Sequence, residues 1–87
     1  MSGAREPAPE LARLRWQCRR GMRELDLLLE GFLDHGYTDA TESERATFRR
    51  LLDYPDPLLL EYLLGSLAPG EREMSDVILR IRGAAAA

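Results

Sequence analysis

The residues whose types and spacing could do chemistry gather around one glycine near the start of the chain. Arg20 precedes Gly21, and Glu24 lies three positions after it. A guanidinium can hold a carboxylate or a carbonyl through paired hydrogen bonds, and a carboxylate can accept hydrogen bonds or a proton. A glycine has no side chain, so another backbone can approach it closely. The cluster therefore indicates a surface that contacts another protein, and a solvated helix corner is the alternative.

This segment resembles the signature of a known family. The run Arg20-Gly21-Met22-Arg23-Glu24 fits the Arg-Gly-x-x-Glu pattern of the FAD assembly factors, small helical proteins that promote covalent flavin attachment. Their targets are the flavoprotein subunits of succinate dehydrogenase and, in bacteria, fumarate reductase. The resemblance covers about residues 11 to 82. Trp16 and Cys18 precede the signature, and further features of the family pattern follow it in order: Leu25-Asp26, Phe32-Leu33-Asp34-His35, Leu51-Leu52-Asp53, Asp56-Pro57 and Pro69.

The resemblance implies which residues meet the partner. In the family the signature faces the flavoprotein near the histidine that becomes linked to FAD. By position this implies partner binding chiefly by Arg20, Gly21 and Glu24. Three neighbouring residues are additional contact candidates: Met22, Arg23 and Asp26.

The resemblance also implies how the chain acts. FAD is held by the partner, and this chain is expected to bind no cofactor stably; its sequence has no glycine-rich nucleotide motif. Attachment requires proton removal from the isoalloxazine methyl group and attack by the partner's histidine. Glu24 could assist as a general base, but holding the partner's domains in a productive geometry is the simpler role. The chain is therefore expected to be an assembly factor or chaperone and not an enzyme, with no catalytic residue of its own.

The other reactive side chains favour structural roles. Cys18 and His35 are the one cysteine and the one histidine, which predicts no disulfide and no metal site. Cys18 is expected to be a small buried apolar residue, and His35 to lie at a helix end. Tyr54 is expected to pack within a loop, with the lining of a surface pocket as the alternative. Trp16 fits either an interface anchor or core or half-buried packing. Three acids are expected on a solvated helix start: Glu71, Glu73 and Asp76.

Length and composition predict an all-α fold, a compact bundle of about five short helices. The 87 residues include sixteen leucines, and a chain of this size buries too little surface for a large internal active site. Residues 1–8 are expected to be a flexible arm, residues 9–82 the single domain, and residues 83–87 a low-complexity tail. No apolar run approaches the roughly 20 residues that cross a bilayer. We expect a bacterial cytoplasmic protein without membrane insertion.

Hydrophobic spacing places the first two helices. Pro9 and Glu10 can open the first, and Gly21 can close it in a left-handed conformation. The second is expected from about Met22 to His35, stopped by the glycine that follows. Its apolar side chains recur at three-and-four spacing, which indicates a buried face: Leu25, Leu28, Leu29, Phe32 and Leu33.

Capping signals place the remaining three helices. The segment Thr41–Glu44 predicts a capping box, with its helix ending near Asp53. Asp56 is expected to cap a fourth helix that runs to Leu64, with proline at its first position. A fifth helix is expected from about Glu71 to Arg82, with one buried side: Met74, Val77, Ile78 and Ile81.

The charge distribution bears on the alternative functions. Residues 1–24 carry six arginines against three glutamates, whereas residues 25–87 carry six arginines against twelve acids. Such polarity suits orientation against a charged protein partner. Nucleic-acid binding through the arginine-rich first helix is an alternative, but a pI of about 5.1 argues against the broad positive surface it needs. An antitoxin-like or other small helical interaction module is the second alternative.

Overall fold

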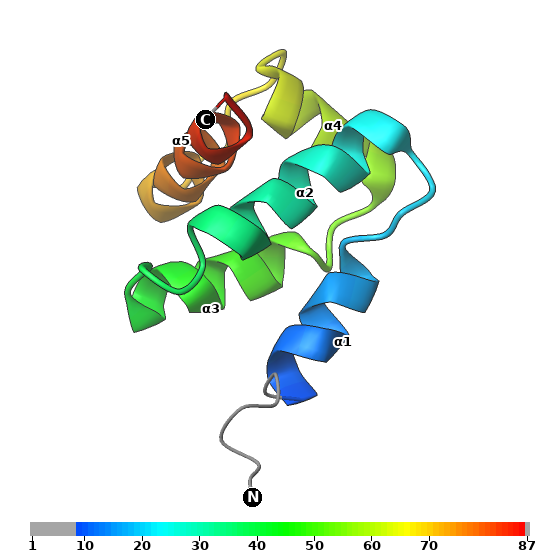
Figure 1. The fold of residues 1–87 in the computed structure, drawn as a ribbon. Helices are drawn as coiled ribbons and strands as arrows, with labels where there is room; N and C mark the ends of the chain where they lie inside the picture. Colours follow the sequence, from blue (N-terminus) through cyan, green and yellow to red (C-terminus); the bar gives the residue numbers. More distant parts are fainter. Residues whose placement is uncertain (1–8, 87) are drawn as a thin grey trace, which may run out of the picture.

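The structure is a computed structural model that describes residues 9–86 (Figure 1). Five helices follow one another: α1 (Pro9–Gln17), α2 (Arg23–His35), α3 (Glu42–Leu51), α4 (Asp56–Leu64) and α5 (Arg72–Ala86). Within residues 9–86 the regular secondary structure is entirely α-helical, which confirms the predicted fold class. The predicted arm, residues 1–8, lies outside the described residues, as does Ala87 at the end of the predicted tail.

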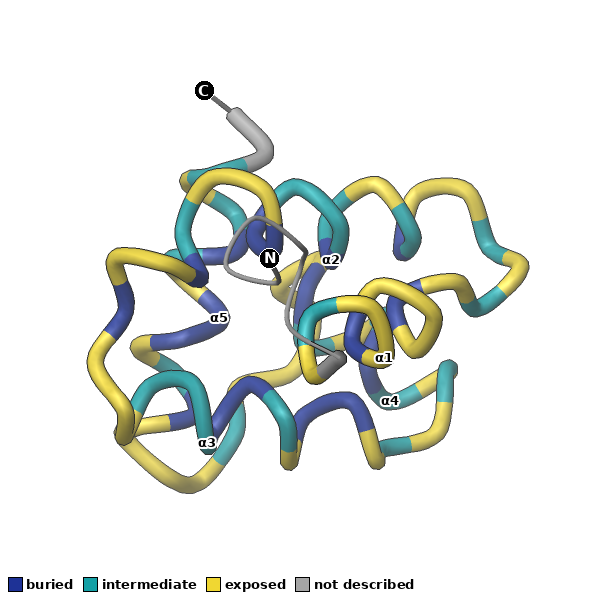
Figure 2. The backbone as a smooth tube through the Cα atoms, turned by 60° about the horizontal axis from the view of Figure 1, so that its bottom comes forward, coloured by how far each residue is buried: buried dark blue, intermediate teal, exposed yellow. Residues whose placement is uncertain are grey.

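α2 crosses the middle of the molecule and forms the centre of the bundle (Figure 1). It packs most extensively against α5, which in turn packs against α3 and α4. Buried positions gather where these four helices face one another, whereas exposed positions predominate on α1 (Figure 2). The core is made of leucine, aromatic and aliphatic side chains that exclude water: Leu25, Leu29, Phe32, Phe48, Leu51, Leu59, Leu63, Met74, Val77 and Ile81.

The predicted inner faces of α2 and α5 are confirmed. The α2 face is buried except at Leu28, which is half-buried and packs against the core. All four positions predicted for α5 are buried. The rings of Phe32 and Phe48 lie 4.8 Å apart between centroids, which joins α2 to α3. Aromatic pairs of this kind stabilise a fold by about 0.5–1.5 kcal/mol beyond their buried area.

The starts of α3 and α4 show one confirmed and one wrong prediction. The capping box is present: the Thr41 hydroxyl accepts from the Glu44 N–H at 3.1 Å, and the Thr41 N–H donates to the Glu44 carboxylate at 2.9 Å. Asp56, however, is not the cap of α4. Pro55 is the N-cap, with an extended backbone, because its carbonyl accepts the first bonds of the helix. The Asp56 carboxylate is instead occupied by Arg20.

Two helix ends differ from expectation. α1 ends at Gln17, before Gly21, because Cys18 already leaves the helix in a turn and the chain must bend to reach α2. α5 continues past Arg82 to Ala86, into the segment predicted as a tail. Alanine has the highest intrinsic helix propensity, and three successive alanines offset the cost of about 1 kcal/mol for Gly83.

Candidate partner-binding site

The predicted contact residues lie at the corner between α1 and α2, which residues 18–22 form, and on the first turn of α2. Gly21 adopts a left-handed conformation with φ 83°, which residues with a side chain rarely take. Gly21 is exposed, and a Cβ atom added to it would meet nothing within 4 Å in the described part of the chain. We call this open corner the Gly21 notch. It has room for at least one further atom beside the backbone.

The guanidinium of Arg20 is engaged within its own chain. Its Nε donates to Oδ1 of Asp56 at 2.8 Å, and its terminal nitrogens donate to the carbonyl oxygens of Leu52, Tyr54 and Gln17 at 2.8, 2.9 and 3.1 Å. The side chain is only 16% exposed. The sequence predicts that this guanidinium binds a partner. In the structure it instead joins the corner to the segment that connects α3 to α4, and we call these bonds of Arg20 to Leu52, Tyr54 and Asp56 the Arg20 bracket. Direct contact of Arg20 with a partner stays a prediction.

Asp26 and Met22 hold the other side of the corner. The backbone N–H of Arg20 donates to the Asp26 carboxylate at 2.7 Å, and the Asp26 N–H donates to the Met22 carbonyl at 2.8 Å. Met22 is the N-cap of α2 and its half-buried side chain packs against the core. Hydrogen bonds to a carboxylate are stronger than neutral ones. The Gly21 notch is therefore held by bonds on both flanks.

Arg23 and Glu24 present opposite charges beside the notch. Both are exposed on the first turn of α2, where the helix dipole favours a carboxylate such as that of Glu24. Trp16 is 73% exposed, which excludes core and half-buried packing, and its role as an interface anchor stays a prediction. Leu27, further along α2, is 60% exposed and was not identified from the sequence, because leucines also fill the buried face of this helix. Leu27 does not fit the three-and-four spacing of the buried face of α2, and this is the signal that could have identified it as exposed.

The basic residues around α1 are partly paired with acids of α2. Arg15 forms an ion pair with Asp34, and Arg19 lies 3.8 Å from the carboxylate of Glu30. Exposed pairs of this kind contribute little stability, but they interrupt the positive stripe that the sequence suggested. The described surface thus gives little support to phosphate binding by α1.

The remaining candidates lie where structural roles predict them. Cys18 is fully buried, and burial raises the pKa of its thiol to about 12, so it is a poor nucleophile. His35 is the basic residue of the last turn of α2. Tyr54 is half-buried and packs against the core, with its ring 6.0 Å from that of Tyr62 on α4. Within residues 9–86 no group of three side chains could hold a metal ion.

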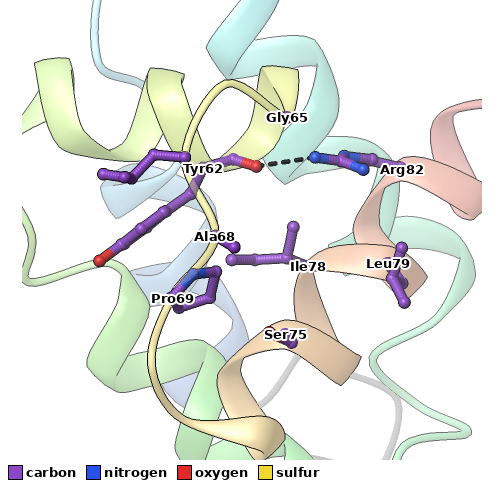
Figure 3. A pocket seen from close by; sticks show the side chains of 9 residues that line it. Tyr62, Gly65, Ala68, Pro69, Ser75, Ile78, Leu79 and Arg82 are labelled. Carbon is purple, nitrogen blue, oxygen red and sulfur yellow. Dashed lines mark hydrogen bonds between the residues drawn. The ribbon is translucent and has the colours of Figure 1, made fainter.

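A cavity of about 240 Å³ lies between the end of α4 and α5 (Figure 3). Its lining is mainly apolar, and among the described residues Arg82 is its one charged side chain. Arg82 donates to the carbonyl oxygens of Tyr62 and Leu63 at 3.0 and 2.9 Å, which satisfies the end of α4. Two donors of its one cation are therefore engaged with α4. No described helix is long and apolar enough to cross a membrane.

Fold and corner together define a small α-helical protein-interaction domain. Residues 12–85 match the Sdh5 family, described as flavinator of succinate dehydrogenase, and the chain belongs to that family. Curated relatives named FAD assembly factor SdhE include one from Coxiella burnetii, 46% identical over 80% of this chain and 85% of the relative. Another from Shewanella oneidensis is 40% identical over 87% of this chain and 93% of the relative. A third, from Xylella fastidiosa, is 44% identical over 88% of this chain and 78% of the relative.

Proposed function

We propose that this protein is an assembly factor that binds the flavoprotein subunit of succinate dehydrogenase, or of fumarate reductase, in the bacterial cytoplasm. Binding promotes the covalent attachment of FAD to that subunit. The observation that carries the proposal is the Gly21 notch, which is exposed and held on both flanks at the position of the family signature. Membership in the Sdh5 family supports the choice of client.

Each part of the corner has its own role in this proposal. Gly21 admits a segment of the partner's backbone. Arg23 offers donors to carboxylate or carbonyl oxygens of the partner, and Glu24 offers acceptors to its N–H groups. The side chain of Met22 supports the notch from the core side, and exposed Trp16 is a candidate anchor because tryptophan is enriched among the residues that dominate binding energy.

The chain acts by holding its partner and not as an enzyme. FAD stays on the flavoprotein, and the residues that form and break bonds belong to that protein. Holding reacting groups in a productive geometry lowers a barrier by several kcal/mol without any chemistry on the binding side. The exposed carboxylate of Glu24 is thus assigned to binding, with no proton transfer required of it.

Reconstitution tests the proposal directly. The purified apo flavoprotein subunit is incubated with FAD, with and without this protein, and flavin fluorescence is read in the band after a denaturing gel. We expect covalent flavin to accumulate faster when the protein is present. Equal fluorescence with and without it would overturn the proposed function.

A matched pair of variants connects this activity to the notch. Asparagine tolerates the left-handed region better than other residues with a side chain, so Gly21→Asn fills the notch and largely keeps its backbone. Gly70→Asn adds the same side chain at another glycine that has open space around it. We expect Gly21→Asn to lose most of the promotion of flavin attachment, and Gly70→Asn to retain it.

A further inference from the structure

The segment that leads from α3 into α4 lies beside the α1–α2 corner, although it is far away in the sequence. Figure 1 shows this segment running beside the connection between α1 and α2. The contact is made by Arg20, whose guanidinium reaches Leu52, Tyr54 and Asp56. One side chain therefore links the residue before the notch to three residues outside the signature.

Asp56 differs from the other partners of the Arg20 guanidinium because its acceptor is a charged side chain, whereas theirs are backbone carbonyl oxygens. Its Oδ1 lies 2.8 Å from Nε of Arg20, and the two side chains are 35% and 16% exposed. At such partial burial a charge-assisted bond is both stronger and more directional than a neutral one. A guanidinium is planar, so a bond from Nε to Asp56 and bonds from the terminal nitrogens to three carbonyl oxygens together set the orientation of the whole group.

Orientation of Arg20 bears directly on the notch because Gly21 is the next residue. The Arg20 side chain is fixed by Asp56 on one side of the backbone, and the Arg20 N–H is fixed by Asp26 on the other. A glycine has the widest choice of backbone conformations of any residue. Without a fixed neighbour it would sample conformations other than the left-handed one that opens the notch.

We propose, on the basis of the function proposed above, that Asp56 is a positioning residue for flavoprotein binding. It holds Arg20, and through Arg20 the conformation of the Gly21 notch, without itself contacting the flavoprotein. Arg20 belongs to the same bracket. The α1–α2 corner is thus the docking site, and the start of α4 holds it in place through Asp56.

Asp56→Ala tests this role in two measurements. The first is the Kd for the apo flavoprotein subunit by titration calorimetry, well below the melting temperature of each variant. A residue that acts through an intermediate changes binding by about 3- to 30-fold, and we expect a loss in this range. The second is the amide NMR signal of Gly21 in the free protein, which is expected to shift or broaden when the bracket is lost.

Two further variants separate positioning from a general structural effect. Asp53→Ala removes an exposed carboxylate from the same segment and is expected to bind as the parent does. Asp56→Glu restores a carboxylate and is expected to recover part of the affinity, which a purely local packing effect would not produce. Adding Arg20→Gln to Asp56→Ala should cost no more than Arg20→Gln alone, because the two residues act as one unit.

The outcomes distinguish the two proposals. If the parent protein itself fails to bind the flavoprotein, the proposed function is wrong and the role of Asp56 in binding is wrong with it. If the parent binds and Asp56→Ala binds equally well, or leaves the Gly21 signal unchanged, the inference about Asp56 is wrong while the proposed function stands. Equal losses from Asp53→Ala and Asp56→Ala would also overturn the inference.

Discussion

The backbone N–H of Arg20 donates a 2.7 Å hydrogen bond to the carboxylate of Asp26, six residues further along the chain. This bond ties the corner around Gly21 to the first turns of α2 within the same chain. The carboxylate of Asp26 therefore has a role within the fold of its own chain.

Removal of this bond should lower stability. Asp26→Ala leaves the Arg20 N–H without its carboxylate, and hydrogen bonds to charged groups contribute about 1.5–3 kcal/mol when fully formed. The site is only partly buried, so we expect a loss of about 1 kcal/mol in the free energy of unfolding, measured by urea titration. Asp76→Ala, at an exposed position of α5, serves as the control and should change stability by less than about 0.5 kcal/mol.

The left-handed conformation of Gly21 predicts that substitution by alanine affects stability differently at Gly21 and at Gly70. Gly21→Ala places a Cβ atom at φ 83° and should destabilise the protein by about 1–2 kcal/mol. Gly70 has an ordinary φ and open space, so Gly70→Ala should be neutral or stabilise by up to about 1 kcal/mol through the unfolded state. Thermal melts of both variants test this difference, and equal melting temperatures would contradict it.

Glu44 predicts a pH dependence of stability. The Thr41 N–H, and then the charge of Arg80, lower the pKa of Glu44 below its ordinary value of 4.5. A carboxyl group with a lowered folded-state pKa stabilises the protein above the ordinary pKa, and this contribution is lost as the pH falls through the lowered one. Urea midpoints at about pH 6 and pH 3 should therefore differ less for Glu44→Gln than for the parent. Glu61→Gln, exposed on α4, should behave as the parent does.

Burial of Cys18 predicts an inert thiol. Burial raises its pKa from 9.0 to about 12, so the folded protein presents almost no thiolate at about pH 8. Iodoacetamide should label the folded protein slowly and the urea-unfolded protein fast, as followed by mass spectrometry. A Cys18→Ala variant carrying Ser43→Cys, an exposed position of α3, is the control and should react quickly when folded. Fast labelling of folded Cys18 would show that this part of the core opens readily.

The same shift has a consequence at alkaline pH. An acid whose folded-state pKa is raised stabilises the protein below its ordinary pKa, and that contribution is lost as the pH rises through the folded value. Between pH 9 and about 12 the folded state is therefore expected to lose stability through Cys18. The parent should fall more steeply than Cys18→Ala when urea midpoints are compared across this range.

Most of the fold could be predicted because its signals are local. The apolar spacing of α2 and α5 identifies their buried faces, since one helical turn brings those side chains to the same side. The capping box of α3 is complete within four residues, so it needs no knowledge of distant chain. Gly21 was also identified correctly as a left-handed residue. The end of α1 was not, because the bend that follows is set by packing against α2.

The partners of the reactive side chains could not be predicted in this way. The carboxylate of Asp56 has the sequence context of a helix cap, and only the approach of Arg20, thirty-six residues earlier, gives it another role. Likewise the sequence of α1 suggests a row of free arginines, whereas acids of the neighbouring helix pair with Arg15 and Arg19. The exposure of Trp16 could not be predicted either, because it depends on which side of α1 packs against the other helices.

Sequence alone determined the helical class, the buried faces and the glycine at which the chain turns, because these depend on backbone preferences and on spacing within one or two turns. Tertiary structure alone decided that Arg20 faces its own chain and that the notch beside it is open. The reason is that a guanidinium binds whichever oxygens the fold brings within about 3 Å, and long-range packing selects them.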